Sequence, residues 1–494
     1  MTQDHPNSQS GSVPRKVRSV AIIGGGASGA IALDSLKKID QFDEIVLYER
    51  RNVPGGVWYL DNKPNKLDVP PGLTQEYLDP KLKIPEFKEG IAELKLPRSN
   101  QERYIHTASY ENLKTNIPEQ LMTFSDEKTW SAPPELIVEK DYVRGTVIQK
   151  YIEKYINRNK SHVVYNTTIE SIDKDYSNPE AKFKLTLRTE LDETNSSGEN
   201  LDKWHYREFD AVVIATGHYH VPYIPNVPGL NEVYNRYPHK ISHSKTFRAT
   251  DDFTNQKIIV IGTRASGADI VEIASSSARE VYQSKRTKEA ALRWKDADNS
   301  ILKPIITKYE LTSSGEVKVY FEDGSVVENP DQIIYATGFR YSYPFLRGLY
   351  PNFTTGYIIP DLYKHTFFIK DPLLSVIGVP TDAISFRAFE FQSVLVSRYL
   401  AGLISLPPLE EQLQWTNERF VLKGDTRSYH TIDFDNKLPY LQSLVDLGGG
   451  VDPIDPEKKG RPFPTWTEED LAKHQEILEK LAKFFGRVKE GVTV

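Results

Sequence analysis

The sequence predicts an α/β protein with two dinucleotide-binding, Rossmann-like units, and two observations carry that prediction. Glycine turns at residues 24–29 and 262–267 each follow a short apolar strand and open a helix. Each unit then ends on the same pattern, D-x-[VI]-[VI]-x-A-T-G, at residues 210–217 and 331–338. A glycine turn and a closing A-T-G pattern that recur together indicate this fold far more specifically than one glycine fingerprint does.

Composition bounds the class of protein. A chain of 494 residues has room for about three domains or for one large two-domain enzyme. The formal net charge of -6 provides no excess of positive charge for a nucleic-acid backbone, so no nucleic-acid partner is expected. Cysteine is absent, which excludes disulfides, thiolate metal sites, iron–sulfur clusters and cysteine nucleophiles. We therefore expect no metal site and predict that any redox chemistry belongs to a bound cofactor.

Apolar periodicity outside the two turns predicts helices near residues 147–155, 389–403 and 467–485. Alternating residues at 183–188 predict one arm of a solvated β-ribbon. A polar stretch over residues 192–203 is expected to separate this arm from the next.

The first unit runs from a buried strand at residues 18–23 to a second strand at 44–48 that ends on Glu49. Glycines let backbone amides approach a pyrophosphate, which the N-terminus of the following helix also stabilises. An acid at the end of the second strand accepts ribose hydroxyls and repels a 2′-phosphate. The first unit is therefore predicted to bind FAD or NAD rather than NADP.

The second unit has a strand at residues 257–261, and its next strand, at 280–284, ends without an acid. Ser284, Lys285 and Arg286 stand at that point instead. Hydroxyl and cationic groups fit a 2′-phosphate, which favours NADPH over NADH. The alternative is that the two cations are ordinary surface charges.

One position departs from the glycine fingerprint, because Arg264 stands where the middle glycine of the second turn is expected. A side chain is thereby added where the backbone should approach a phosphate. Two outcomes are open: the loop bulges and the guanidinium itself contacts a phosphate, or NADPH binds more weakly.

Two further motifs point to a family. Residues 49–58 read E-x-x-x-x-x-G-G-x-W, and residues 110–118 read Y-x-x-L-x-T-N-x-P. Together with the tandem units, they make the chain similar to the flavin-containing monooxygenase family, and within it to the soluble fungal members, over nearly all of its length from Val17. The resemblance implies a glutathione-reductase-like fold with FAD in the first unit and NADPH in the second.

The resemblance also implies that an NADPH-binding domain is inserted into an FAD-binding domain. We expect a disordered tail over residues 1–16 and an FAD-binding domain made of residues 17–229 and 340–494. The NADPH-binding domain is expected at residues 230–339. The second part of the FAD-binding domain would include the C-terminal helices.

Asn116 is the one residue that the resemblance implies to be catalytic. Its amide would reach the reactive edge of the flavin and help hold a flavin hydroperoxide, although an Asn before Ile-Pro is by itself more often a turn former. The aromatic residues Trp58, Tyr219 and Phe389 either line the flavin site or belong to the core. The positions expected to bind FAD or NADPH are Gly24, Gly26, Ala27, Ser28, Gly29, Glu49, Arg50, Gly56, Val57, Trp58, Thr216, Gly217, Tyr219, Gly262, Arg264, Ala265, Ser266, Gly267, Ser284, Lys285, Arg286, Thr337, Gly338 and Gln392.

The stretch that identifies the family, F-x-G-x-x-x-H-x-x-x-[FY], is altered in this chain. His243 and Phe247 match it, whereas Tyr237 and His239 replace its Phe and Gly. Its ending argues against a Baeyer–Villiger enzyme, in which H-x-x-x-W-P is expected. We expect His243 to organise the linker between the domains rather than to transfer a proton.

These expectations describe an oxidoreductase: an NADPH-dependent flavin monooxygenase that oxygenates a small-molecule amine, sulfide or thiol with dioxygen. Rival interpretations are an NADPH oxidase or reductase on the same fold that produces hydrogen peroxide, a Baeyer–Villiger-type oxygenase, and a non-enzymatic NADPH-binding sensor. Because the sequence shows no export signal and no membrane anchor, a cytoplasmic flavoprotein is expected. A homo-oligomer is compatible with the sequence.

Overall fold

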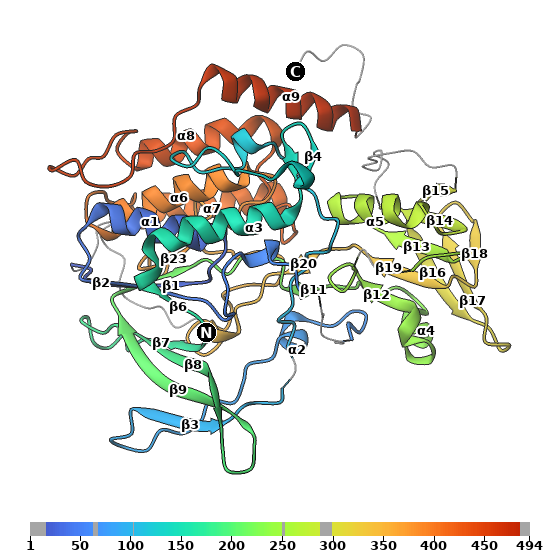
Figure 1. Cartoon of the computed structure of the whole chain (residues 1–494), viewed down its shortest axis with the longest axis horizontal. Coiled ribbons are helices and arrows are strands. Elements are labelled where there is room, and N and C mark those ends of the chain that lie inside the picture. The colour runs from blue at the N-terminus through green and yellow to red at the C-terminus, as the bar shows by residue number, and fades with distance from the viewer. Residues whose placement is uncertain (1–15, 63–67, 102, 249–251, 287–298, 485–494) are drawn as a thin grey trace.

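The chain forms two lobes, each built around a β-sheet (Figure 1). The sheet of the smaller lobe is parallel, and that of the larger lobe is parallel from β23 to β6 with antiparallel strands at the β21 edge. The predicted tail, apart from Lys16, lies outside the residues that the structure describes. The computed structural model describes residues 16–62, 68–101, 103–248, 252–286 and 299–484.

The larger lobe contains a seven-stranded sheet in the order β21-β22-β23-β10-β1-β2-β6. Its central strands are buried on both faces, which explains why they read as continuous apolar runs such as the AVVI of β10. The strands are β1 (Ser19–Ile23), β2 (Glu44–Tyr48), β6 (Val163–Val164), β10 (Ala211–Ile214), β21 (Leu362–Tyr363), β22 (Phe367–Phe368) and β23 (Leu374–Val376).

Helices cover one face of this sheet, and a four-stranded antiparallel sheet lies on its other side (Figure 1). Helix α1 packs against α3 and α6, and α8 packs against α6. The helices of this lobe are α1 (Ala27–Ile39), α2 (Gln75–Leu78), α3 (Gly145–Ile156), α6 (Ser385–Leu400), α7 (Leu409–Lys423), α8 (Lys437–Leu447) and α9 (Glu468–Phe484). The remaining strands of this lobe are β3 (Glu93–Pro97), β4 (Ile137–Glu139), β5 (Tyr142–Val143), β7 (Thr167–Asp173), β8 (Phe183–Thr194) and β9 (Asn200–Phe209).

The smaller lobe contains a five-stranded parallel sheet in the order β12-β19-β13-β14-β15, beside a three-stranded antiparallel sheet. Its helices are α4 (Leu230–Arg236) and α5 (Ala265–Ser275). Its strands are β12 (Ile241–His243), β13 (Lys257–Ile261), β14 (Glu280–Ser284), β15 (Ser300–Lys303), β16 (Ile306–Leu311), β17 (Val317–Phe321), β18 (Val326–Glu328) and β19 (Gln332–Tyr335).

The parallel parts of the two sheets repeat one construction, which confirms the predicted fold class. In the larger lobe the last residue of β1 pairs with the last residues of β10 and β2. In the smaller lobe the last residue of β13 pairs in the same way with the last residues of β19 and β14. In both lobes a glycine turn follows, and a helix begins at Ala27 or at Ala265. The two turns therefore occupy the carboxyl edge of their sheets, where ligands of α/β proteins bind.

The chain passes between the lobes beside a short two-stranded ribbon. Strand β11 (Val221–Pro222) pairs antiparallel with β20 (Phe339–Arg340). This ribbon lies close to the predicted domain boundaries at 229–230 and 339–340, which themselves stay a prediction.

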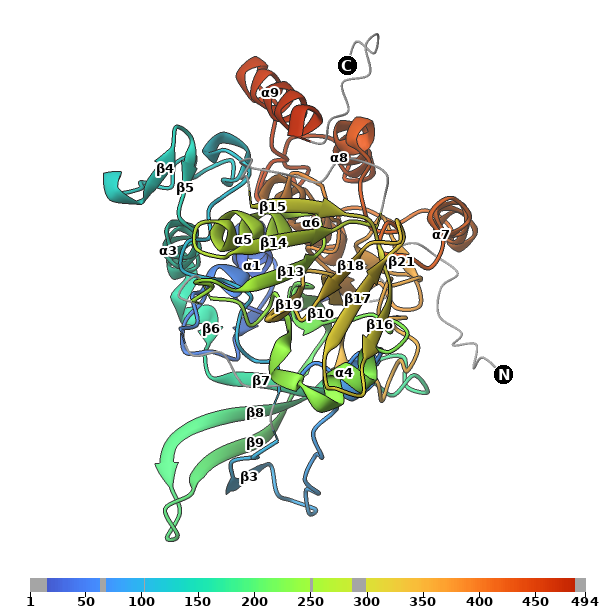
Figure 2. The same ribbon diagram turned by 90° about the vertical axis from the view of Figure 1, so that its right-hand side faces the viewer.

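The helices predicted at residues 147–155, 389–403 and 467–485 correspond to α3, α6 and α9. The gap between the two strands is shorter than the predicted polar stretch at 192–203, because β8 and β9 both extend into that stretch. The two strands form a projecting hairpin (Figure 2). Polar strand residues are stable here because the buried Arg188 pairs with Glu170 at 2.8 Å and with Asp202 at 2.9 Å.

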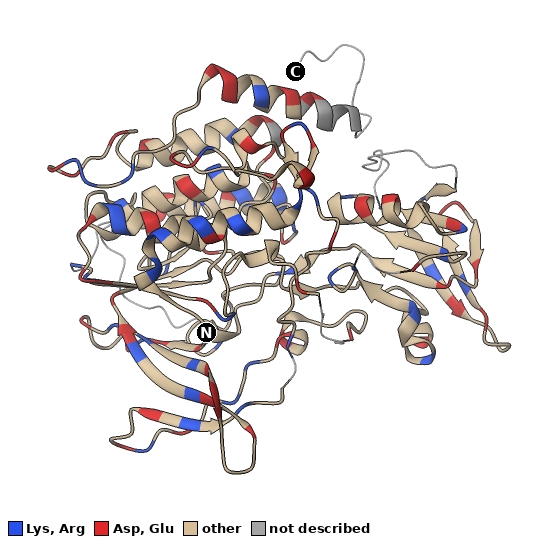
Figure 3. Ribbon diagram, in the orientation of Figure 1, with Lys and Arg blue, Asp and Glu red and all other residues tan. Residues whose placement is uncertain are grey.

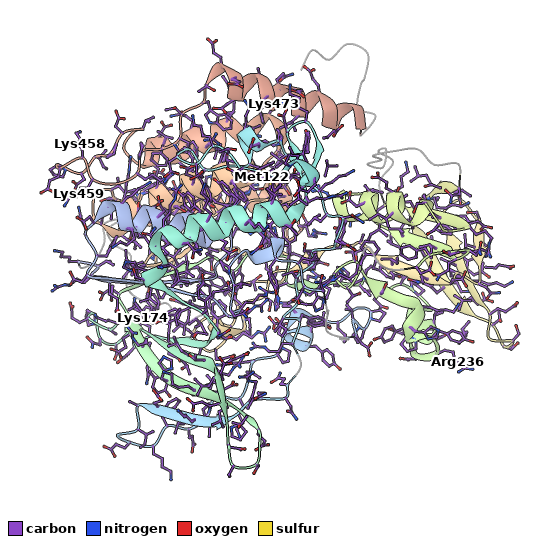
Figure 4. The ribbon with its side chains drawn as sticks, in the orientation of Figure 1. Met122, Lys174, Arg236, Lys458, Lys459 and Lys473 are labelled. Atoms are coloured by element: carbon purple, nitrogen blue, oxygen red, sulfur yellow. The ribbon has the colours of Figure 1, made fainter. Side chains whose placement is uncertain are left out.

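Charged residues of both signs are interspersed over both lobes (Figure 3). Met122, the one sulfur-containing residue among those that the structure describes, is buried in the core of the larger lobe (Figure 4). No helix within the described ranges is long and apolar enough to cross a bilayer.

Arg461 fastens the C-terminal part of the chain to the core of the larger lobe. Its guanidinium is buried and pairs at 2.6 Å with Asp34 of α1 and at 2.6 Å with Asp126. It also donates at 2.7 Å to Glu390 of α6. One cation therefore holds α1 and α6 together under the first glycine turn.

We expect Arg461→Met to lower the free energy of unfolding by about 3–5 kcal/mol, because buried carboxylates would lose their partner. Thermal and urea unfolding followed by circular dichroism measure this. The control is Arg18→Met, whose exposed pair with Asp43 should contribute no more than about 1 kcal/mol. Equal effects of the two substitutions would contradict the assignment.

Candidate functional site

The first glycine turn leaves no space for side chains at two of its positions. Gly24 has φ +108°, and an ideal Cβ there would lie 2.6 Å from the carbonyl oxygen of Ala215. A Cβ on Gly29 would overlap the carbonyl oxygen of Gly24. Both residues must therefore be glycine for β1, β10 and α1 to pack as they do.

A second glycine loop lies directly on the first. The backbone N–H of Gly55 donates to the carbonyl of Gly25 at 2.9 Å. Gly56 has φ +57°, and an ideal Cβ there would lie 2.9 Å from the Cα of Gly26. Gly26 itself has φ −83°, so its conformation suits any residue, and its Cβ would meet only Gly56, at 3.4 Å or more. Gly26 and Gly56 thus present bare backbone at the N-terminus of α1, where a pyrophosphate would fit.

Glu49 closes this site at the end of β2. Its buried carboxylate accepts the backbone N–H of Gly25 at 2.7 Å and that of Arg51 at 2.9 Å. These bonds fix the carboxylate and leave acceptor capacity on both oxygens, as the predicted contact with ribose hydroxyls requires. The residues present therefore fit the adenosine diphosphate part of FAD.

Three other residues expected at this site have their polar groups directed toward protein. The guanidinium of Arg50 lies 3.3 Å from Nδ1 of His220, and burial together with Arg51 lowers the pKa of Arg50 to about 9. Ser28 Oγ donates to Ala215 at 3.3 Å. The buried amide of Gln392 accepts the Gly378 N–H at 3.0 Å and donates to the backbone and side chain of residues 365 and 366. The contact of Ser28 and Gln392 with a cofactor stays a prediction.

The remaining residues expected at the first site differ in their exposure. Val57 and Trp58 lie in the 3-10 helix Gly56–Trp58 and are half-buried. Thr216 and Gly217 are exposed, as is Tyr219, whose side chain is 47% accessible. Ala27 is buried at the start of α1.

The second glycine turn repeats the construction of the first. Gly262 has φ +128°, and an ideal Cβ there would lie 2.5 Å from the carbonyl oxygen of Ala336. A Cβ on Gly267 would overlap the carbonyl oxygen of Gly262. Ala265 and Ser266 form the first turn of α5. The second turn therefore presents a helix N-terminus with the same geometry as the first.

Arg264 does not make this loop bulge. Its φ and ψ are −93° and −173°, against −83° and −169° for Gly26. Its guanidinium pairs with both carboxylate oxygens of Asp382 in the larger lobe, at 2.9 Å and 3.2 Å. The pair is exposed, so it contributes little stability, and it lies at the mouth of the second turn.

The three residues expected to read a 2′-phosphate differ in their surroundings. The Ser284 hydroxyl is buried and donates to the carbonyl of Pro304 at 2.9 Å, away from solvent. Lys285 is half-buried, and Arg286 is exposed. Arg286 is therefore the group most available to a phosphate.

Asn116 lies in the larger lobe between two anchored residues. Thr115 exchanges hydrogen bonds with Val143, at 2.9 Å through its backbone N–H and 3.1 Å through its hydroxyl, and Ile117 packs on the core. The Asn116 side chain itself is exposed. Its position is fixed by the backbone on either side while its amide stays accessible to a ligand.

His243, the last residue of β12, is hydrogen-bonded through both ring nitrogens, and its role in the linker between the domains stays a prediction. Its Nε2 lies 2.9 Å from the carbonyl of Gly338, and its Nδ1 accepts the N–H of Lys245 at 3.1 Å. Since a carbonyl only accepts, the proton resides on Nε2. Burial lowers the pKa of His243 to about 3, so the ring is neutral.

Two residues at the junction, Arg427 and His218, are not among the site residues predicted from the sequence. Arg427 donates to the carbonyl of Thr337 at 2.7 Å, and its guanidinium fills the space where Gly338 lacks a side chain. His218 follows the first A-T-G, and its two buried ring nitrogens have no hydrogen-bond partner among the described residues. Arg427 lies in a polar loop without a motif, so its approach to Gly338 is visible only in three dimensions.

The fold and these two turns define a protein with two Rossmann-like units, and comparison with known proteins gives the family. The profile of the flavin-binding monooxygenase-like family matches residues 97–294 and 288–447. The chain belongs to this family. It is 29% identical to the flavin-containing monooxygenase iboF of Amanita muscaria, over 84% of this chain and 85% of that protein. It is 28% identical to ustF2 of Aspergillus flavus, over 84% and 88%.

Solved structures agree with the fold. The S-allyl-L-cysteine S-oxygenase of Allium sativum superposes with a TM-score of 0.72 at 23% identity, covering 96% of this chain and 94% of that one. Tmm of Pelagibacter superposes with a TM-score of 0.66 at 19% identity, covering 95% and 91%. The family confirms the predicted enzyme class, a flavin-dependent monooxygenase that uses FAD and NADPH, with dioxygen as co-substrate.

Gly26→Ala is expected to fold normally and to bind FAD roughly tenfold to 100-fold more weakly, because its methyl group enters the space meant for phosphate without striking the protein. Flavin absorbance after gel filtration measures retention. Gly29→Ala is the contrasting variant, since its methyl group would overlap Gly24 and should destabilise the fold itself. Full FAD retention by Gly26→Ala would contradict the placement.

Arg286→Ala is expected to raise KM for NADPH on the order of tenfold and to leave KM for NADH nearly unchanged, because a charge-assisted bond to the 2′-phosphate is lost. Steady-state oxidation of both nucleotides measures this. Arg279→Ala, at another exposed arginine of the same lobe, is the control. Equal changes for NADPH and NADH would make Arg286 an ordinary surface charge.

Proposed function

We propose that this protein transfers one oxygen atom of dioxygen to a soft nitrogen or sulfur nucleophile: an amine, a sulfide or a thiol. The observation that carries the proposal is the pair of identically built glycine turns, one in each lobe. Arg264 of the second turn pairs with Asp382 of the larger lobe. The named activity of the Allium sativum protein, S-oxygenation, supports the sulfur substrates.

The cofactors would supply the redox chemistry: FAD, reduced by NADPH, activates dioxygen for transfer to the substrate. We propose that the first turn, Gly56 and Glu49 hold FAD, with Trp58 and Tyr219 at its entrance. The second turn and Arg286 would hold NADPH. The domain assignment follows the same division, with residues 17–229 and 340–494 around FAD and 230–339 around NADPH.

The protein's own side chains would position and shelter rather than exchange protons. The histidines near the junction are neutral, because burial lowers the pKa of His218 to about 4 and that of His243 to about 3. Asn116 presents an uncharged amide that can donate and accept without changing protonation state. Such groups orient bound cofactors and keep bulk water out of the site.

The ratio of oxygenated product to NADPH consumed distinguishes the proposed oxygenation from peroxide production. The purified protein, supplied with FAD, NADPH and a panel of amines and sulfides, should form one oxygenated product for each NADPH consumed with at least one substrate. Hydrogen peroxide equal to NADPH with every substrate would establish an oxidase instead. Ketone conversion to esters would establish Baeyer–Villiger activity, against which the sequence H-x-x-x-F at His243–Phe247 argues.

The compartment and assembly are part of the proposal. We propose a cytoplasmic protein, since the cysteine-free chain needs no oxidising environment to fold. A homo-oligomer is compatible with the two-lobe structure, and the molar mass measured by light scattering decides the oligomeric state.

Asn116→Ala is expected to keep the rate of flavin reduction by NADPH and to shift at least half of the NADPH consumed from oxygenated product to hydrogen peroxide, because a positioned hydrogen bond is worth roughly 1 kcal/mol or more. Product and peroxide assays measure the two yields. Asn352→Ala, at another exposed asparagine of the larger lobe, is the control. An unchanged product yield would remove Asn116 from the mechanism.

A further inference from the structure

The segment that carries Asn116 is anchored on both lobes. We call residues 110–117 the strap. Its first residue, Tyr110, packs in the core of the smaller lobe, where its ring meets Phe247 edge-on with centroids 5.3 Å apart. Leu113 packs against the same core. The strap thus begins in one lobe although Asn116 lies in the other.

Polar contacts join the strap to α5, the helix of the second glycine turn. The Tyr110 hydroxyl donates to the carboxylate of Asp269, and Nζ of Lys114 lies 3.4 Å from Glu272. Asp269 follows Gly267 by two residues and is buried within the first turns of α5. The strap is therefore fastened directly behind the backbone that we propose to hold NADPH.

The other end of the strap is fastened to the larger lobe. The carbonyl of Leu113 accepts the N–H of Gly145, the first residue of α3, at 2.8 Å. Thr115 is held by Val143, and Ile117 is held by the core. Figures 1 and 2 both show α3 and α5 near each other at the junction of the lobes. With anchors at alternate residues, little backbone freedom remains between Tyr110 and Asn116.

The hydrogen bond between Tyr110 and Asp269 is shielded from water, and the Tyr110 hydroxyl stays protonated. Both partners are buried, and burial together with Asp269 raises the pKa of Tyr110 well above its usual value, so the hydroxyl keeps its proton and donates. A hydrogen bond to a carboxylate is roughly twice as strong as one between neutral groups. A phenylalanine would serve packing equally well, and so the hydroxyl adds a fixed direction to the contact.

We propose that Tyr110 is a positioning residue for the oxygenation step, and that the strap conveys occupation of the second nucleotide site to Asn116. This inference rests on the proposed function. A nucleotide bound at the N-terminus of α5 reduces the motion of that helix, and the Tyr110–Asp269 hydrogen bond in turn reduces the motion of the strap. Asn116 is then held most firmly when NADPH or NADP is present, which is when oxygen transfer needs it.

The direct test is hydrogen exchange of the FAD-loaded, oxidised protein with and without NADP. In the natural sequence, NADP should slow exchange both at residues 262–272 and along residues 111–117. In Tyr110→Phe the slowing at 262–272 should remain, and that along the strap should fall roughly tenfold. Tyr309→Phe removes another buried hydroxyl contact of the smaller lobe, that with Tyr335 at 2.6 Å, and should preserve both effects.

Catalytic coupling supplies the second test. Tyr110→Phe should raise the fraction of NADPH that ends as peroxide, and in an Asn116→Ala background it should add nothing further, because both changes act through one residue. Additive effects, or strap protection that survives Tyr110→Phe, would overturn the inference. If Tyr110→Phe does not fold, Asp269→Asn replaces it and should give a smaller loss in the same direction.

These outcomes are distinguishable from failure of the proposed function. A natural protein that forms only peroxide with every substrate would overturn oxygenation, while the exchange experiment still decides whether the strap responds to NADP. Coupled oxygenation that Asn116→Ala disrupts and Tyr110→Phe does not would overturn the role of Tyr110 alone.

Discussion

The structure depends on the missing side chains at the ends of two central strands. An ideal Cβ on Gly24 would lie 2.6 Å from the carbonyl oxygen of Ala215, and one on Gly262 would lie 2.5 Å from that of Ala336. Only glycine therefore lets the backbone pass so close to the A-T-G segment that follows the neighbouring strand. That approach lets strand, turn and helix close together, so that the helix N-terminus points out of the carboxyl edge of the sheet. Because one constraint is applied twice in one chain, the protein has two helix N-termini of the kind that bind phosphates, and we propose that they hold a flavin and a nicotinamide donor.

Three nitrogen-bearing side chains at the junction between the lobes donate to backbone carbonyls. Lys245 donates to His106 at 2.8 Å, Arg248 to Asp61 at 2.8 Å, and Arg427 to Thr337 at 2.7 Å. A carbonyl is fixed by the backbone, so such bonds transmit the position of one lobe to the other without depending on the rotamer of an acidic partner. The exposed Arg264–Asp382 pair is different, since both of its partners are side chains and a phosphate can replace the Asp382 carboxylate beside Arg264.

The sequence predicted the fold class, both glycine turns and three of the helices, because each depends on local spacing and on glycine sterics. The sequence showed that Arg264 replaces a glycine but not how the loop accommodates it. The backbone needs no glycine there, since φ is negative, and the guanidinium pairs with a residue 118 positions away in the sequence. Arg427 and the Tyr110–Asp269 contact could not be predicted, because each joins segments that only the tertiary fold brings together. The hydrogen bonds of the Gln392 amide to Gly378, His365 and Thr366 could not be predicted either, because they depend on the tertiary fold, and its contact with a cofactor stays a prediction.

Anaerobic mixing of the FAD-loaded protein with NADPH tests the central claim most directly. If two nucleotides meet across the lobe junction, one equivalent of NADPH will bleach the flavin absorbance in a single saturable phase. An oxidised flavin that persists in excess NADPH, or a chain that never retains FAD, would contradict the account.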